Sequence, residues 1–370
     1  MLIAEVIKAI ESIAPPHLQA GWDNTGLQTG DRSATCTGVL LAVDVNSDVI
    51  DEAARRGCNL VVSHHPLIFK GLKSLTGDSP VQRAVAAAIR ADIAVYSSHT
   101  SLDSAEGGIS YTMASMLGAT PVEALDPADE KQERVSVTVP PDMADHVRML
   151  IFDLGTQPEP GSDAVLSRYD ISASTLHTAL PEGDGFGDIP ESITINRPMT
   201  RIEAVMSRQN RRRLTDLLAD SPDGHRISIE ATALAPASHA RQGLGVYALM
   251  NEPMTMRAFL DHVKATFGCA CIRYSALPDP DATVRRIACC GGSGGEFIPA
   301  AIGFGAQVYV SADIRYHDFD TYADDIVVVD AGHYETENCA KDIFYHVLTK
   351  KFPNFAVYYS ETDKNPVKYL

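Results

Sequence analysis

The residues best suited to chemistry lie in three short segments, each of which follows a run of apolar residues. These runs span 60–63, 93–97 and 326–329, and the residues that follow them are His64 and His65, then His99 and Asp103, then His333 and Glu337. Imidazole nitrogens and carboxylate oxygens are ligands that zinc, iron and manganese accept in proteins. Three such segments, drawn from both ends of the chain, together predict one shared metal site.

Each segment taken alone also has a simpler explanation. Adjacent histidines point in different directions along an extended chain, so His64 and His65 suit two neighbouring cations, although core or surface histidines would look the same. Asp103 could cap the helix that follows it. Glu337 could complement a helix dipole. His333 and Glu337 are four residues apart, however, so they share one face of a helical turn, where Glu337 could bridge two cations.

A glycine-rich run at 291–295, GGSGG, is placed between a predicted strand and a predicted helix. Backbone N–H groups in such a loop can bind an anion. The run lacks the lysine of a Walker sequence, and a tight turn from strand to helix explains it equally well. If the loop does bind an anion, the candidate substrate-binding residues are Gly291, Gly292 and Ser293.

Two further segments could border the same site. His317 follows the apolar run 307–311 and could be a general acid or base, or simply a surface residue. Trp22, the only tryptophan, lies in GWDNTG at 21–26 and could line the mouth of a site or pack within a turn.

The spacing of apolar residues predicts alternating strands and helices at both ends of the chain. Strands are expected at 39–43, 60–63, 93–97, 284–289, 307–311, 326–329 and 355–359. Helices are expected at 47–56, 80–91, 109–117, 256–267, 296–303, 315–323 and 334–350. This alternation predicts two α/β halves with largely parallel sheets. In such sheets ligands bind beyond the carboxyl ends of the strands, which is where the candidate residues fall.

The middle of the chain differs from both ends. A charged, proline-containing stretch begins at Asp126, and a β-α-β, β-α-β order follows up to residue 234. That order is typical of a ferredoxin-like α+β domain. The run PEGDGFGDIPE at 181–191 is expected to be a loop within it. We therefore predict a first α/β half at 1–127, an inserted domain at 128–240 and a second α/β half at 241–370.

Composition narrows the classes of function. Lysine and arginine number 31 and aspartate and glutamate 48, which gives a net charge of −17, and 45% of the residues are hydrophobic. This balance excludes a disordered chain and argues against a dedicated nucleic-acid binder. No run reaches the ~18 apolar residues of a membrane span, and the N-terminus does not resemble a signal peptide. The seven cysteines contain no C-x-x-C pair, which favours reduced thiols and a cytoplasmic protein.

Six segments together resemble the Nif-three-like family of dinuclear-metal proteins, often named GTP cyclohydrolase I type 2 homologues. They occur in the family's order and span both α/β halves. The segments are GWDNTGLQTG (21–30), VVSHHPLIFKGLKSL (61–75), VYSSHTSLDSAEGG (95–108), CCGGSGGEFIPAA (289–301), VYVSADIRYHDF (308–319) and DAGHYETE (330–337).

The resemblance implies a more detailed site. Two divalent metal ions, zinc, iron or manganese, would be bound by His64, His65, Asp103, His333 and Glu337. His99 and His317 would lie near the metals as proton-transfer or substrate-contact residues. The family also implies that the α/β halves form one Nif-three-like core and that the insert resembles CutA. It further implies self-association into a homohexameric toroid whose metal sites face an internal cavity.

Two functions remain open at this point. The first is a metal-dependent hydrolase of a nucleotide-like or phosphate-bearing small molecule, because two metals can activate water and hold the attacking and leaving oxygens. The family name implies GTP ring opening, although a fold does not dictate a substrate. The second is a non-catalytic regulatory or scaffold toroid that depends on its metals. Open coordination positions for water would favour the hydrolase.

Overall fold

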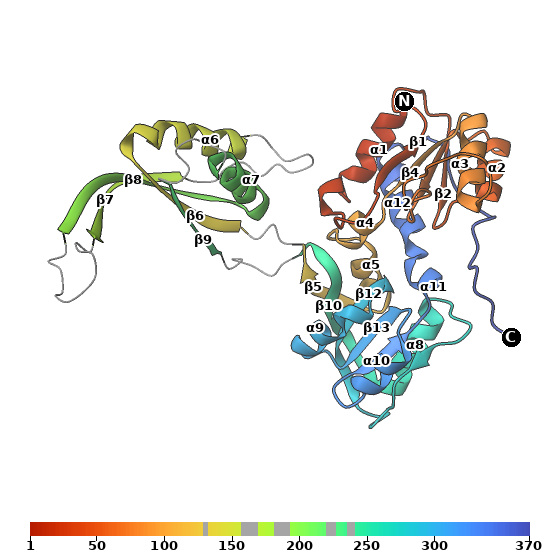
Figure 1. Ribbon diagram of the computed structural model, residues 1–370. Coiled ribbons are helices and arrows are strands. Elements are labelled where there is room, and N and C mark those ends of the chain that lie inside the picture. The colour runs from red at the N-terminus through yellow and green to blue at the C-terminus, as the bar shows by residue number, and fades with distance from the viewer. Residues whose placement is uncertain (129–131, 157–168, 181–192, 220–226, 235–240) are drawn as a thin grey trace. The chain divides into compact units, whose positions relative to one another are not determined.

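The computed structural model describes residues 1–128, 132–156, 169–180, 193–219, 227–234 and 241–370. The chain divides into two units, one made of residues 1–128 with 238–370 and the other of residues 129–237 (Figure 1). Both predicted α/β halves therefore belong to a single unit, and the middle segment is separate from it. The expected loop at 181–191 lies outside the described residues.

The first sheet of the larger unit has five strands in the order β1-β4-β3-β2-β15. Four strands are parallel, and β1 pairs with β4 in the antiparallel direction. Their bounds are β1 Gly26–Thr29, β2 Val39–Ala42, β3 Leu60–Ser63, β4 Ala94–Ser97 and β15 Val357–Tyr359. Every residue of β2, β3 and β4 is buried, as their apolar runs predict.

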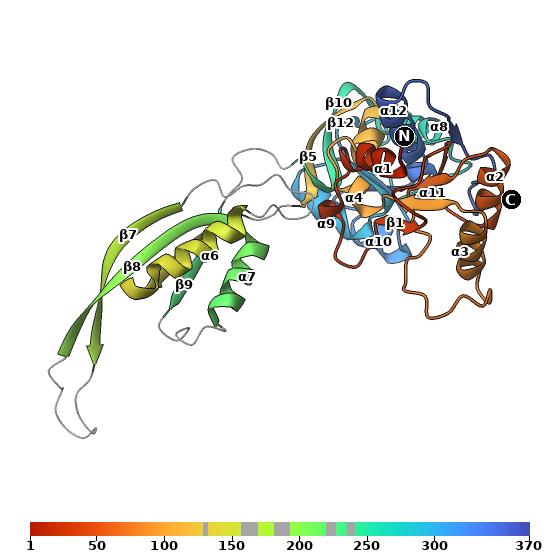
Figure 2. The ribbon, with the colours of Figure 1, turned by 90° about the horizontal axis from the view of Figure 1, so that it is seen from above.

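Helices cover both faces of this sheet (Figure 1, Figure 2). One face carries α2 and α3, and the other carries α1 and α12. Their bounds are α1 Ile3–Glu11, α2 Ser47–Arg55, α3 Pro80–Arg90 and α12 Cys339–Lys351. Local sequence sets the helix starts: the Asn46 side chain accepts a hydrogen bond from the Val49 amide, and Ser79 caps the Gln82 amide ahead of Pro80.

The second sheet has six strands in the order β11-β14-β13-β12-β10-β5. Only β12, β13 and β14 are parallel to one another. The strands are β5 Ala119–Pro127, β10 Gly243–Thr255, β11 Arg273–Tyr274, β12 Thr283–Ser293, β13 Val308–Ala312 and β14 Val327–Asp330. The remaining helices of this unit are α4 Thr100–Asp103, α5 Ile109–Met116, α8 Met256–Thr266, α9 Ile298–Gly303, α10 Tyr316–Thr321 and α11 His333–Glu337.

The two predicted halves exchange strands, which the sequence pattern does not predict. Strand β15 of the C-terminal half pairs with β2 in the first sheet, and strand β5 of the N-terminal half pairs with β10 in the second. Neither β5 nor β10 was expected, because β5 is an edge strand whose prolines and acidic residues hide its alternation. Two other expectations were wrong in detail. Asn338 separates α11 from α12 within the expected helix 334–350, and β12 continues into the glycine run as far as Ser293.

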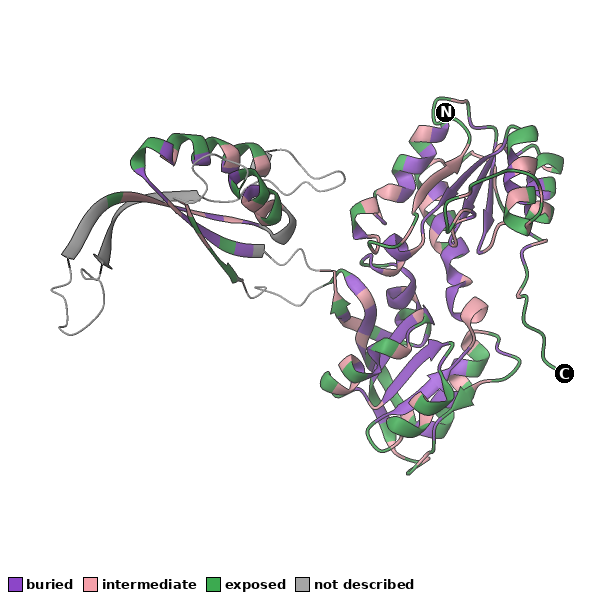
Figure 3. Cartoon of the chain, viewed as in Figure 1, coloured by how far each residue is buried: buried purple, intermediate pink, exposed green. Residues whose placement is uncertain are grey.

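One apolar core joins the two sheets. Val39 and Leu41 of β2 point into it together with residues of α5, α8, α12 and the second sheet, whereas Leu40 and Ala42 point toward α2 and α3. This alternation follows from the period of two residues in a strand. Figure 3 shows inner strands of both sheets, such as β2, β3 and β13, as buried and the outer faces of the helices as exposed. The sheets are thereby held as one body, and the ends of their strands are fixed relative to each other.

The smaller unit has the element order β-α-β-β-α-β. Its sheet runs β7-β8-β6-β9, and all three strand pairs are antiparallel. Val135, Val137 and Val139 of β6 alternate into a core with residues of both helices. The elements are β6 Gln132–Val139, α6 Ala144–Thr156, β7 Tyr169–Leu180, β8 Ile193–Ser207, α7 Arg208–Ala219 and β9 Ser228–Ala233.

Two expectations from composition concern the whole described chain. Among the helices of the described ranges, none has both the length and the apolar character to cross a membrane. All seven cysteines are free thiols, and all but Cys271 are buried.

The segment that follows β15 is tied to α2 by one buried carboxylate. Glu52 is 3% exposed and accepts hydrogen bonds from the Glu361 and Thr362 amides, each at 3.0 Å. The Ser360 and Thr362 hydroxyls each donate to it at 2.7 Å. Burial by itself would raise the pKa of Glu52, but these hydrogen bonds outweigh it and lower the pKa from 4.5 to about 2. The carboxylate form therefore stabilises the fold.

Replacing this carboxylate tests its contribution. We expect Glu52→Gln to lower the free energy of unfolding at pH 7 by about 1–3 kcal/mol, because the pKa shift corresponds to at most about 3 kcal/mol. A lowered pKa stabilises the fold above the unfolded value and loses that effect as the pH falls. The difference between variant and wild type should therefore shrink between pH 4.5 and about 2 in urea unfolding curves. Glu361→Gln, at a side chain that is 83% exposed, is the matched control and should change stability by less than about 0.5 kcal/mol.

Candidate metal centre

The predicted ligands meet beyond the carboxyl ends of three strands, two in the first sheet and one in the second. β3 leads into His64 and His65, β4 leads through His99 into α4, and β14 leads into α11 (Figure 1). Three groups form, within each of which the ligand atoms lie within 4.8 Å of one another. The groups are His64 with His65 and His99, then His65 with His333 and Glu337, and then His64 with Asp103 and Glu337.

Glu337 is the centre of this cluster. Its Oε1 lies 3.6 Å from His64 Nε2. Its Oε2 lies 2.9 Å from His65 Nε2 and 3.0 Å from His333 Nε2. Asp103 Oδ1 lies 3.7 Å from His64 Nε2 on the Oε1 side. The two oxygens of one carboxylate therefore face two different sets of ligand atoms.

All four histidines are oriented in the same way. Each Nδ1 lies 2.7–3.0 Å from a protein oxygen that can only accept a hydrogen bond, so Nδ1 carries the proton. Each Nε2 is thereby left for the cluster, and such a partner on Nδ1 is the usual support of a metal-binding histidine. The pairs are His64 with the Ser98 carbonyl, His65 with Asp44, His99 with Asp23 and His333 with Asp313.

Three buried atoms of the cluster have no hydrogen-bond partner within the described residues. They are His64 Nε2, Asp103 Oδ1 and Glu337 Oε2, and the histidine nitrogens near Glu337 Oε2 lack hydrogen-bond geometry. An unsatisfied buried polar atom costs about 1–3 kcal/mol. Cations bound to these atoms would remove that cost, so the residues present fit a metal.

Without a metal, the positive charge that faces the buried carboxylates of the cluster comes from its histidines. Burial raises the pKa of Asp103 to about 7. Burial would also raise the pKa of Glu337, but the positive charge of neighbouring histidines, His64 first, holds it well below its usual range. Burial opposes the charged form of His65, yet contacts with Asp44 and Glu337 raise its pKa to about 10. Protons on histidines thus provide the positive charge, and a cation must displace them in order to bind.

The glycine run packs behind Glu337. Gly292 has a φ of +61°, and a Cβ there would collide with Glu337 Oε1, so only glycine leaves room for the carboxylate. Its amide donates to Thr336 Oγ1 at 3.1 Å, and the Gly291 amide donates to Ser110 Oγ at 3.4 Å. Ser293 is exposed. These two amides are therefore engaged within the protein, and the predicted contact of this run with a substrate stays a prediction.

The second predicted proton-transfer residue lies elsewhere. His317 is exposed on the first turn of α10, and its ring contacts Tyr316 with the centroids 5.4 Å apart. Within the described chain it belongs to none of the ligand groups. His99, in contrast, has ring centroids 5.3 Å from His64 and 5.4 Å from His65. The structure thus brings His99 into the cluster and leaves His317 outside it.

Sequence reasoning missed the carboxylates that orient the histidines. Asp44 lies two residues beyond the end of β2, and Asp313 directly follows β13, so both stand near strand ends like the ligands themselves. Asp23 is fully buried, and it also accepts hydrogen bonds from the Thr100 amide and hydroxyl. Asp23 and Asp313 lie in segments whose neighbouring residues, Trp22 and His317, the sequence indicates as site residues. Their position near strand ends is the feature of the sequence that could have identified Asp44 and Asp313 as partners of the histidines.

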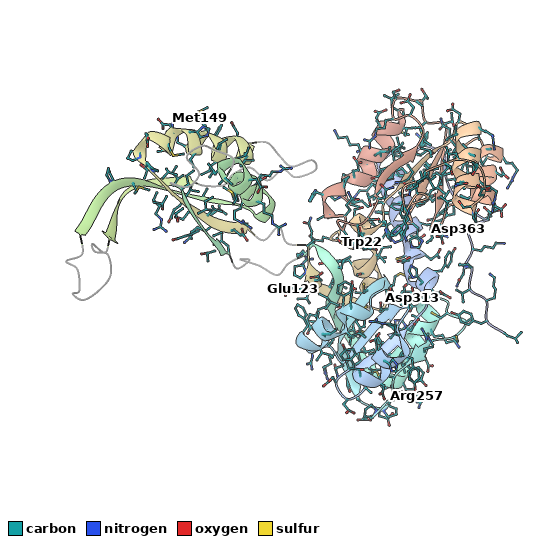
Figure 4. All side chains as sticks on the ribbon, viewed as in Figure 1. Trp22, Glu123, Met149, Arg257, Asp313 and Asp363 are labelled. Carbon is teal, nitrogen blue, oxygen red and sulfur yellow. The ribbon has the colours of Figure 1, made fainter. Side chains whose placement is uncertain are left out.

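A cavity of about 470 Å³ lies beside His65 and His333. Four carboxylates, Asp44, Asp313, Asp330 and Glu335, contribute to its walls. The C-terminal residues 365–367 and 369 form another side. In Figure 4, Asp313 and Trp22 lie in the middle of the larger unit, and Asp363 lies at the start of its C-terminal tail.

The fold and the site define a class: an α/β protein of two joined sheets with a histidine and carboxylate cluster suited to metal. The chain belongs to the Duf34/NIF3 (NGG1p interacting factor 3) family, whose sequence profile matches residues 1–366. This match confirms the resemblance inferred from the six segments. It covers both sheets and the inserted unit.

Individual relatives match along the whole chain. The GTP cyclohydrolase 1 type 2 homolog of Bacillus subtilis is 29% identical over 377 aligned positions, which cover 99% of this chain and 98% of the relative. The crystal structure of a Bacillus cereus protein related to NIF3 is 28% identical, with a TM-score of 0.67, and covers 100% of this chain and 99% of that one. The Staphylococcus aureus protein SA1388 has the same fold, with a TM-score of 0.69 at 24% identity over 100% and 99% of the two chains.

Removing the charge of the central carboxylate should abolish metal binding. We expect Glu337→Gln to lose most bound Zn²⁺ or Mn²⁺, because both oxygens of Glu337 face ligand sets. Elemental mass spectrometry of untagged, reconstituted protein measures the metal content per chain. Glu335→Gln changes a neighbour on the same helix outside the ligand groups and should keep the wild-type content. Equal metal content in Glu337→Gln and wild type would contradict the assignment.

A carboxylate that orients a ligand should matter less than the ligand. We expect Asp313→Asn to weaken metal binding about 10- to 100-fold, because the amide can no longer act as a charged acceptor for His333 Nδ1. Competition with a chromophoric chelator measures this affinity. Asp320→Asn, at an exposed position on α10, provides the control. If Asp313→Asn and Asp320→Asn bind metal equally well, Asp313 does not support the site.

Proposed function

We propose that this chain is a dinuclear metal-dependent hydrolase of a nucleotide-like or phosphate-bearing small molecule. The observation that carries the proposal is the buried Glu337 carboxylate, whose two oxygens face separate ligand sets. His64, Asp103 and Glu337 would hold one ion, and His65, His333 and Glu337 would hold the other. Three protein ligands per ion leave coordination positions open for water, as catalytic sites require.

Divalent cations held by these residues would supply Lewis acidity and lower the pKa of bound water. His99 is the chain's own candidate for moving a proton. Its Nδ1 is held by the buried Asp23 at 2.8 Å, which leaves Nε2 free for exchange with a substrate or water. Its ring is 15% exposed, so solvent reaches it at the edge of the cluster. This pairing of an oriented imidazole with a buried acid suits general acid–base catalysis.

The substrate class rests on chemistry and on relatives. Paired metals favour substrates whose reacting oxygens carry negative charge, such as phosphate esters. The name of the Bacillus subtilis relative, GTP cyclohydrolase 1 type 2 homolog, supports a nucleotide-like molecule. We also propose Ser293 and His317 as outer substrate contacts, since both are exposed. The glycine run would contribute through the backbone at Gly291 and Gly292.

Two features of organisation complete the proposal. We propose a ferredoxin-like, CutA-like fold for the inserted unit, supported by its β-α-β-β-α-β order and its strand order β7-β8-β6-β9. We also propose self-association into a homohexamer, which rests on the family resemblance in the sequence.

The function is tested by hydrolysis in protein of known metal content. Zinc-, manganese- and iron-loaded protein is assayed with GTP, other nucleotides and p-nitrophenyl phosphate. We expect turnover by the wild type and a loss of about 10²- to 10⁴-fold in His99→Ala, which keeps its metals. His346→Ala, at an exposed histidine on α12, is the control.

Two outcomes would contradict this proposal. A fully loaded wild type that turns over no member of the panel would argue for the non-catalytic alternative. Wild-type rates in His99→Ala would remove the proposed role of that imidazole and leave the metals as the only catalytic groups.

A further inference from the structure

Two large aromatic side chains remain exposed at the edge of the cluster. Trp22 is 63% exposed and Phe69 is 47% exposed. Their ring centroids are 5.9 Å apart, and both rings adjoin His99, at 6.0 Å for Trp22 and 6.2 Å for Phe69. Tryptophan is usually well buried, so this surface is available for something other than core packing. The two rings border the one histidine of the cluster that has a proposed role in proton transfer.

The backbone beside both rings is fixed by hydrogen bonds. Asn24 Nδ2 donates to the Ile68 carbonyl at 2.6 Å, and the Ile68 amide donates to Gln28 Oε1 at 3.3 Å. Asp23, next to Trp22, is held by the Thr100 amide at 3.0 Å. The segments that carry Trp22 and Phe69 are thus joined to each other and to α4. Two exposed rings on a fixed backbone form a preorganised surface, which reduces the entropy lost when a ligand binds.

Charge distinguishes this edge from the cavity beside His65 and His333. Asp44, Asp313 and Glu335 line that cavity, and its Arg273 is already paired with Asp330. The segment after Phe69 carries Lys70 and Lys73, which are exposed and form no ion pair within the described residues. In a chain of net charge −17, these lysines place positive charge in the segment that carries one ring of the aromatic pair. The two lysines therefore attract an anionic ligand to the aromatic edge.

We propose that Trp22 and Phe69 form a stacking subsite for a planar ring of the substrate, and that Lys70 and Lys73 attract its phosphate. Aromatic faces stack on any nucleobase, whereas free lysines recognise anionic groups. The ligand class is therefore a ring-bearing phosphate compound, such as a nucleotide. The subsite rests on the proposed hydrolase function in one respect: the ligand that it binds would be the substrate that reaches the metals past His99.

Because Trp22 is the only tryptophan, its fluorescence reports on this subsite directly. Zinc-loaded protein is titrated with GMP, guanosine, ribose 5-phosphate and inorganic phosphate. We expect quenching by GMP and by guanosine, with GMP binding more tightly, and none by the two compounds that lack a planar base. Phe69→Leu should weaken GMP binding about 10- to 100-fold. Phe152→Leu, at a phenylalanine that is 51% exposed in the inserted unit, is the matched control.

The lysines are tested separately from the rings. The double variant Lys70→Gln with Lys73→Gln should weaken GMP binding and leave guanosine binding unchanged. Equal weakening of both ligands would overturn the role of the lysines.

The outcomes separate this inference from the proposed function. Quenching by GMP that depends on Phe69, in protein that hydrolyses nothing, supports the subsite and contradicts the hydrolase. Hydrolysis of p-nitrophenyl phosphate with no GMP quenching, or with GMP binding equal in Phe69→Leu and wild type, overturns the subsite and leaves the hydrolase standing. Quenching by ribose 5-phosphate as strong as by GMP also overturns ring recognition.

Discussion

The burial of the Glu337 carboxylate is the constraint on which the rest of this structure depends. Its side chain is 4% exposed and is surrounded by histidine nitrogens, with one oxygen left without a hydrogen bond. A buried negative charge is tolerated only where positive charge meets it. In the protein alone that charge comes from protonated histidines, and a metal ion would replace it more compactly. The close packing of Gly292 against this carboxylate fixes where the charge lies.

The histidines can serve that carboxylate only because the two sheets are locked together. His64 and His65 follow a strand of the first sheet, whereas His333 follows a strand of the second. The exchange of β5 and β15 between the halves and the core shared by both sheets hold these ends in register. The tail after β15 also helps to hold the strand ends in place. Asp363 accepts a hydrogen bond at 2.8 Å from the amide of Val43, the residue before Asp44.

A consistent polarity follows from this arrangement. Every histidine of the cluster turns Nδ1 outward to an oxygen and Nε2 inward, so the ligands are oriented before any cation arrives. Two of the carboxylates that accept from Nδ1, Asp44 and Asp313, line the cavity. The other edge of the cluster carries the exposed rings of Trp22 and Phe69, with lysines in the segment after Phe69. The two edges of the cluster therefore differ in which ligands they can admit.

The sequence by itself determined the candidate ligands and the α/β character. Strands such as β3 are buried on both faces and so appear as unbroken apolar runs, and His64 and His65 stand directly after one of them. It did not reveal β5 and β10, because prolines, glycines and charged residues break the alternation of apolar residues in both strands. Only the tertiary structure selected His99 over His317, assigned Asp44 and Asp313 to their histidines, and placed Trp22 beside Phe69. Those pairings join residues far apart in the chain, and they depend on how strands are ordered in a sheet, which local spacing does not encode.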